Sequence, residues 1–142
     1  MRGWAYDGAA VSSAFMTTMS FVQFDHMAVE VRALEASANL MASILGTGAP
    51  VPEGEDGDML RIDLAHDAFI LFSPSDSPRF AHVAFRVDVE RFREVVERLR
   101  GRGIPFGNDP NDAKNGMTGD FLGGAGRVYF TDDNGHLWEV AC

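Results

Sequence analysis

Two stretches of the chain share one pattern of apolar and polar positions. Residues 24–46 and 80–101 both begin Phe-x-His-x-Ala, continue as an alternating strand and then become helical. Alternation with period two places successive side chains on opposite faces, so each strand has a mainly apolar face and a face that carries a histidine. His26 and His82 stand at the same place in the two copies. The repeat predicts two related modules whose apolar faces pack against helices and whose histidine faces line a cavity.

The helix of each copy is expected to be amphipathic. The helix of the second copy repeats its apolar residues at the i, i+3, i+4, i+7 spacing, as Phe92, Val95, Val96 and Leu99. Charged residues cover its other side, and a nearby glycine is expected to end it. The helix of the first copy also has an apolar stripe and is predicted to stop at Gly46.

Each helix is followed by two strands that read as a hairpin. Residues 58–65 and 67–73 alternate on either side of a turn near His66. Residues 126–132 and 135–141 do the same on either side of an Asp-Asn-Gly turn. Runs of β-branched and aromatic residues bounded by Asn and Gly are typical of hairpins.

Short extended segments at 50–53 and 104–106 complete the element list. The predicted fold class is therefore α+β, with two βαβββ modules, each a small curved mixed sheet with one helix on its outer face. Module one covers about residues 21–75 and module two about residues 79–142. Residues 1–20 show no clean period and are predicted to form a loose N-terminal arm.

The connection over residues 107–125 is rich in Gly, Asn and Asp and has neither a helical nor a strand period. Loops of this length in compact domains are usually functional or disordered. We expect a mobile lid over the histidine face, because closure of such loops commonly excludes water from a reacting centre.

Composition narrows the possible partners. The 142 residues are 46% hydrophobic and include 21 acidic and 12 basic side chains, for a net charge of −9. Such an acidic chain is a poor general binder of nucleic acid, and no apolar run reaches the roughly 18 residues of a membrane span. The single cysteine, Cys142, cannot form an internal disulfide. We therefore expect a cytoplasmic protein that contacts neither nucleic acid nor membrane.

Three residues are candidate metal ligands. His26 and His82 occupy equivalent strand positions, and Glu139 lies in the last predicted strand. If the two modules pack about a pseudo-twofold axis, these side chains meet in a shared cleft. A site with two histidines and one carboxylate suits Fe(II), Mn(II) or another divalent ion and leaves coordination positions open for a substrate.

Three motifs in order give the chain a family resemblance. They are His26 opening a strand before Leu-Glu-Ala-Ser, the segment His-Val-Ala-Phe from His82, and the segment GRVYFTDDNGHLWE that ends at Glu139. Over residues 21–142 the chain resembles the vicinal oxygen chelate superfamily, also called the glyoxalase/bleomycin resistance protein/dioxygenase family. The resemblance implies paired modules around a metal-binding cleft, Glu139 as the third ligand, a small substrate chelated through two oxygens, and a homodimer.

The chain departs from parts of that family. Members of the glyoxalase I type carry a fourth ligand, a glutamate, at a position that the repeat aligns with about Leu71. The site then looks more like the three-ligand sites of fosfomycin thiol transferases and extradiol dioxygenases. Ala28 stands where the fosfomycin enzymes have a threonine. The metal is expected to be divalent, with Fe, Mn, Zn, Ni and Co not distinguished.

Further side chains are predicted to contact the substrate. Tyr129 would share the cleft and, with Glu139, is a candidate catalytic residue. Arg86 and Arg127 are candidates for binding an anionic substrate, although Arg86 could instead pair with its repeat neighbour Glu30 and Arg127 could be solvated. The residues expected to line an apolar pocket are Phe24 and Phe80.

Three classes of function remain open on the sequence. The first is a metal-dependent enzyme with dioxygenase, lyase/isomerase or thiol transferase chemistry. The alternative is a non-catalytic protein that binds and sequesters a drug or another small molecule, which the acidic charge and the many phenylalanines would suit. A domain that serves dimerisation or sensing is a third possibility. The modules could pair within one chain or across two subunits.

Overall fold

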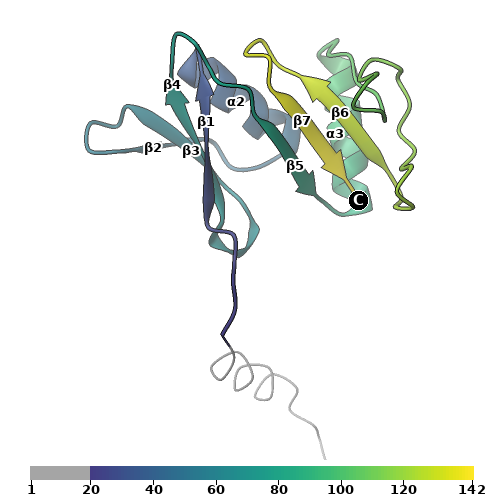
Figure 1. Ribbon diagram of the computed structural model, residues 1–142, viewed down its shortest axis with the longest axis horizontal. Coiled ribbons are helices and arrows are strands. Elements are labelled where there is room, and N and C mark those ends of the chain that lie inside the picture. The colour runs from purple at the N-terminus through teal and green to yellow at the C-terminus, as the bar shows by residue number, and fades with distance from the viewer. Residues whose placement is uncertain (1–19) are drawn as a thin grey trace, which may run out of the picture.

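A computed structural model describes residues 20–142, so nearly all of the predicted N-terminal arm lies outside the described residues. The first module contains one helix, four strands and a short 3-10 turn, and the second contains one helix and three strands (Figure 1). In chain order these are β1 His26–Val31, α2 Leu34–Leu45, β2 Val51–Glu53, β3 Met59–Asp63, η1 Ala65–Asp67, β4 Phe69–Pro74, β5 His82–Arg86, α3 Val89–Gly101, β6 Arg127–Thr131 and β7 Leu137–Ala141.

The strands form two separate mixed sheets, which confirms the predicted α+β fold. The first has the order β1-β4-β3-β2 and the second the order β5-β7-β6. In each sheet the first strand of the module pairs in parallel with the last, and the hairpins are antiparallel. Strands β1 and β5 therefore lie at sheet edges, and each pairs with only one strand among the described residues.

One hydrophobic core lies between the two sheets and the helices. The Trp138 ring of β7 is at its centre and is fully buried, with ring centroids 6.4 Å from Phe72 in the other sheet and 6.1 Å from Phe85. Val29 and Val31 of β1 are buried on the same side. Since side chains alternate along a strand, the histidine face of each sheet is the face turned away from this core.

The helices are fixed to each other through their ends. Helix α3 begins after Asp88, whose side chain accepts a hydrogen bond from the Arg91 amide at 2.7 Å, as is usual for an N-cap. Helix α2 ends at Gly46 with φ 71°, as predicted. The Arg91 and Arg98 guanidinium groups of α3 donate to carbonyl oxygens at this end. Cations at a helix C-terminus also interact favourably with its dipole.

The β6–β7 turn attaches the second module to the first. The Asn134 side chain accepts a hydrogen bond from the Arg32 amide at 2.8 Å. His136 is fully buried, accepts from the Ala81 amide at 3.1 Å and contacts the Glu30 carbonyl oxygen through Nε2 at 2.5 Å. These contacts make His136 a structural residue.

Two sequence expectations differ from the structure. Residues 104–106 do not form a strand; the only pairing near them among the described residues is an isolated bridge between Gly107 and Tyr129. The 107–125 connection is hydrogen-bonded within itself and to β6, for example through the Arg127 amide, which donates to the Thr118 carbonyl oxygen at 3.0 Å.

Among the described residues no helix has the length and hydropathy that a membrane span needs.

Candidate metal and substrate site

His82 and Glu139 are brought together by the parallel pairing of β5 and β7. The register places Ala84 opposite Glu139 and His82 two residues earlier on the same face. The His82 Nε2 atom lies 2.9 Å from the Glu139 Oε1 atom. The Glu139 side chain is 9% exposed and the His82 side chain is 44% exposed, so the pair has one buried and one open member.

The second oxygen of Glu139 is engaged by a buried arginine. The Arg127 Nη1 atom donates to Glu139 Oε2, and Arg127 Nε donates to Asp120 Oδ1 at 2.8 Å. The Asp120 hydrogen bond raises the pKa of the guanidinium, which stays charged. Arg127 was expected to face water or an anionic substrate, and it is instead buried between two carboxylates.

Tyr129 lies beside this pair on the same face of the sheet. Its register partner on β7 is Glu139, and its ring centroid is 6.3 Å from that of His82. The side chain is buried. Burial first, and then the negative charge of Glu139, raise the pKa of the Tyr129 hydroxyl above its usual value. The hydroxyl therefore keeps its proton at neutral pH.

His26 opens β1 but does not join His82 and Glu139. Its Nδ1 atom lies 2.5 Å from the Asp25 Oδ2 atom, and its ring stacks on Phe69 with centroids 4.8 Å apart. Among the described residues of one chain, no three His, Cys, Asp or Glu side chains gather closely enough to hold a metal ion. The convergence expected within a shared cleft does not occur inside one chain, because the histidine faces of the two sheets point away from their common core.

The donor atoms nevertheless fit a divalent ion. Two ligands at a right angle, with metal bonds of roughly 2.1 Å, have donor atoms about 3.0 Å apart. The 2.9 Å separation of His82 Nε2 and Glu139 Oε1 is compatible with that spacing, and it is also the length of an ordinary hydrogen bond, which joins the two side chains in this structure. A hydrogen bond between a histidine Nδ1 and a carboxylate is the usual partner of a metal-binding Nε2, and His26 has this bond to Asp25.

The strand register shows which residue of module one is equivalent to Glu139 of module two. Strand β1 pairs with β4 so that Ala28 lies opposite Leu71. Strand β5 pairs with β7 so that Ala84 lies opposite Glu139. Leu71 therefore occupies in module one the position that Glu139 occupies in module two, as the repeat predicted, and no carboxylate stands there.

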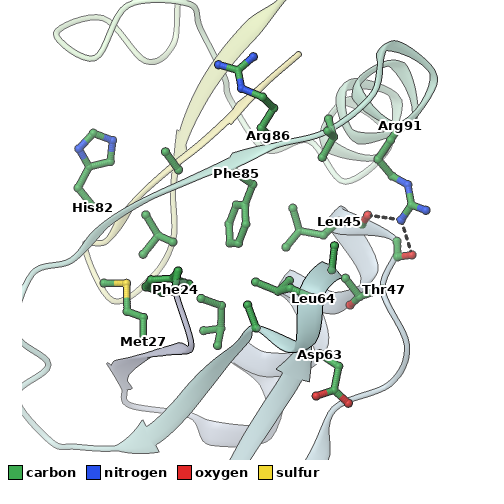
Figure 2. A pocket seen from close by; sticks show the side chains of 17 residues that line it. Phe24, Met27, Leu45, Thr47, Asp63, Leu64, His82, Phe85, Arg86 and Arg91 are labelled. Carbon is green, nitrogen blue, oxygen red and sulfur yellow. Dashed lines mark hydrogen bonds between the residues drawn. The ribbon is translucent and has the colours of Figure 1, made fainter. Parts of the chain in front are cut away.

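A pocket of about 700 Å³ opens beside the β5 edge, between the two modules (Figure 2). Most of its lining is apolar, and His82, Phe24 and Arg86 contribute to it. Phe80 does not line this pocket and is largely exposed. The suggested partner of Arg86, Glu30, pairs instead with Arg79, whose Nε is 3.0 Å from the Glu30 carboxylate.

Two residues of the site were missed by sequence reasoning. The Arg61 guanidinium lies 3.9 Å from the centroid of Phe69, the ring on which His26 stacks, and binds Asp63 at 2.6 Å. The repeat could have suggested Arg61, because it faces Leu71 as Tyr129 faces Glu139. Nothing in the sequence marked Asp120, since its contact with Arg127 depends on how the loop folds.

Comparisons with known proteins agree on the family. The model of the Glyoxalase/Bleomycin resistance protein/Dioxygenase superfamily matches residues 23–140. The chain is similar to oxidase ChaP-H1, with 31% identity over 85% of this chain and 95% of that chain and a TM-score of 0.78. Oxidase ChaP-H2 is 28% identical over 86% and 94% of the two chains, with a TM-score of 0.77.

A more distant structure shares the fold. The fosfomycin resistance protein FosX from Listeria monocytogenes, complexed with Mn(II) and sulfate ion, is 19% identical over 87% of this chain and 91% of that chain, with a TM-score of 0.58. The family match spans nearly the whole described part of the chain and agrees with its two related modules of strands and one helix each. The chain belongs to the Glyoxalase/Bleomycin resistance protein/Dioxygenase superfamily.

Proposed function

We propose that the protein is a divalent-metal-dependent enzyme that oxidises a small substrate bearing two vicinal oxygens, with dioxygen as the oxidant. The observation that carries this proposal is the 2.9 Å separation of His82 Nε2 and Glu139 Oε1, which suits two neighbouring ligands of one ion. The 31% identity to oxidase ChaP-H1 over 85% of the chain favours oxidation over lyase or transferase chemistry.

We further propose that His26 of a second copy supplies the third ligand. The histidine faces point away from the core of their own chain, so a cleft between them needs a module from another chain. Strands β1 and β5 are both sheet edges, and such edges can pair with another chain. A twofold dimer would pair module one of each chain with module two of the other and form two equivalent sites.

The ion, when bound, would supply Lewis-acid and redox chemistry to the chelated oxygens. The chain's own residues would hold the ion and donate a hydrogen bond beside it. Glu139 presents one oxygen to the site while Arg127 holds the other. The protonated Tyr129 hydroxyl is a hydrogen-bond donor beside the carboxylate. The 700 Å³ pocket lies on the core side of β5 and is lined by neither Glu139 nor Tyr129, so the enzymatic proposal assigns it no part of the substrate.

A metal titration with a catechol probe tests this proposal. We expect Mn(II)-loaded or Fe(II)-loaded protein to bind a catechol and consume dioxygen, and chelator-treated protein to do neither. The His82→Ala variant should lose metal binding and oxygen uptake. His66→Asn is a matched control, because His66 lies in an exposed turn with φ 58° and asparagine tolerates that conformation.

The competing function is metal-independent sequestration of a small molecule, which the mostly apolar 700 Å³ pocket favours. In that case an aromatic ligand would bind equally well before and after chelator treatment, and His82→Ala would bind it as the parent protein does. Such a result would replace the enzymatic proposal.

A further inference from the structure

We propose that Asp120, acting through Arg127, is a positioning residue that orients the Glu139 carboxylate and sets the charge of the site. The inference rests on the proposed role of Glu139 as a metal ligand. In this proposal the loop over residues 107–125 is not a lid. It supports the site because Asp120, which lies in the loop, holds the Arg127 guanidinium in place.

Asp120 is held rigidly in its loop. Its Oδ1 atom accepts a hydrogen bond from the Leu122 amide at 2.9 Å, and its Oδ2 atom accepts one from the Gly124 amide at 3.1 Å. The same two oxygens accept from Arg127 Nε at 2.8 Å and from Arg127 Nη2 at 3.4 Å. The Asp120 side chain is 2% exposed, so water competes little for these bonds.

The backbone around Asp120 is fixed to the last two strands. The Ala125 amide donates to the Cys142 carbonyl oxygen at 3.0 Å, and the Cys142 amide donates to the Gly126 carbonyl oxygen at 3.0 Å. Gly124 leaves no room for a side chain, because a Cβ atom there would collide with the Asp120 carboxylate. The position of Asp120 is therefore set by the fold.

Arg127 transmits this position to Glu139. Its guanidinium is planar and rigid, so fixing Nε and Nη2 on Asp120 also fixes the direction of Nη1. Nη1 binds Glu139 Oε2, which leaves Oε1 directed at His82. Because the carboxylate is held by one oxygen, the other is presented in a single orientation.

The three charges also determine the electrostatic character of the site. Asp120 and Glu139 are negative and Arg127 is positive, so the group keeps one net negative charge toward a bound cation. Without Asp120, the buried Arg127 would be balanced by Glu139 alone, and the group would become neutral. A neutral group attracts a divalent ion less strongly than a negative one does.

Mn(II) alone is the probe for this inference. We expect Asp120→Asn to weaken Mn(II) binding about tenfold, the lower end of what loss of a ligand's supporting partner usually costs. Asp120→Glu should restore part of the affinity. Asp112→Asn is the matched control, because it removes the same charge from the same loop at an exposed residue and should bind Mn(II) as the parent protein does.

A double variant separates this inference from the proposed function. Glu139→Gln should abolish tight Mn(II) binding, and adding Asp120→Asn to Glu139→Gln should weaken the residual affinity by less than the tenfold expected in the parent, because only the charge effect remains once no ligating carboxylate is left to orient. Unchanged Mn(II) binding by Glu139→Gln would overturn the proposed function and this inference with it. Loss of binding by Glu139→Gln, with normal binding by Asp120→Asn, would overturn this inference alone. If Asp120→Asn does not fold, a folded Asp120→Glu that binds Mn(II) several-fold more weakly than Asp112→Asn supports the inference, and one that binds equally overturns it.

Discussion

At the scale of single residues, the two oxygens of Glu139 have different partners. Oε1 faces His82, and Oε2 is bound by the buried Arg127. Removing one member of such a buried charged set leaves an uncompensated charge, which is more costly than the intact set is stabilising. Arg127 lies on β6, in the same sheet as Glu139. By binding Oε2, it leaves Oε1 as the oxygen of Glu139 that can form one further bond.

The first residue-scale prediction concerns Leu71. Leu71→Glu places a carboxylate at the position equivalent to Glu139, beside His26 on the adjoining strand. In the proposed shared site it would supply a fourth protein ligand, so we expect Mn(II) to bind about tenfold more tightly, as affinity rises with the number of charged ligands. Leu71→Gln is the matched control and should not tighten binding. Equal affinities in a Mn(II) titration of Leu71→Glu and the parent would contradict the proposed shared site, in which the Leu71 position adjoins the ion.

A related prediction concerns activity. Glyoxalase I-type members use the missing carboxylate as a base on a substrate carbon, a role implied by the family resemblance. With Leu71 in that place, we expect little or no turnover of the hemithioacetal of methylglyoxal and glutathione by the metal-loaded protein. A spectrophotometric assay of thioester formation checks this, and efficient turnover would show that another base serves the reaction.

The third residue-scale prediction concerns pH. Hydrogen bonds from Arg127 hold the pKa of Asp120 below its ordinary value of about 3.9. Since the folded pKa is the lower one, the stabilisation is complete above about pH 4 and is lost as the pH falls through the folded pKa. Urea unfolding of Asp120→Asn should therefore show a lower stability than the parent at pH 7 and a smaller loss on acidification. A parallel acid profile for the two proteins would contradict this linkage.

The site residues differ in how far their positions and partners could be predicted from the sequence. The equivalence of His26 with His82, and of Leu71 with Glu139, was predictable because the repeat aligns each pair, and the strand registers agree with it. Arg127 was predicted as a site residue, but its pairing with two carboxylates was not predicted, and nothing marked Asp120, because a charged residue in a polar segment looks solvated until the fold buries it. Glu30 was matched to Arg86 by the repeat, but its partner is Arg79 from the linker, which no repeat position indicates.

At the scale of elements, the period-two strands and the amphipathic helices were predictable from their own residues. The turn at His66 and the cap at Gly46 also follow from local chemistry. The extended segment expected at residues 104–106 does not form a strand, because these residues pair with no described strand and only Gly107 bridges to Tyr129. The anchoring of the 107–125 loop likewise depends on contacts with distant strands.

The element-scale prediction concerns the contact of α2 with α3. Gly46 has φ 71°, and a Cβ atom there would lie 2.6 Å from Arg98 Nη1 and 3.0 Å from Arg91 Nη1. Gly46→Ala should therefore cost the roughly 1–2 kcal/mol of a left-handed alanine and also displace the arginines that cap α2. Gly135→Ala is the matched control, since Gly135 has φ 83° and open space around it. We expect urea unfolding to show a larger loss for Gly46→Ala, and equal losses would contradict a capping role for the arginines.

At the scale of the whole molecule, the shared core decides where the site can form. Trp138 packs between the sheets, and the histidine face of each sheet is the face turned away from this core. The sequence alone left pairing within a chain and pairing across subunits open, because both place His26 and His82 at equivalent positions. The direction in which each sheet packs favours two chains, each completing the other's site.

The central claim is tested most directly by mixing two inactive variants. His26→Ala and Glu139→Ala chains should each fail to bind Mn(II) tightly when alone. Co-refolded in equal amounts, they should recover roughly a quarter of the parent's Mn(II) capacity, because half of the dimers are mixed and each mixed dimer has one intact site. Native mass spectrometry verifies that mixed dimers form. Mixed dimers that bind no Mn(II) would contradict a site shared between two copies of the chain.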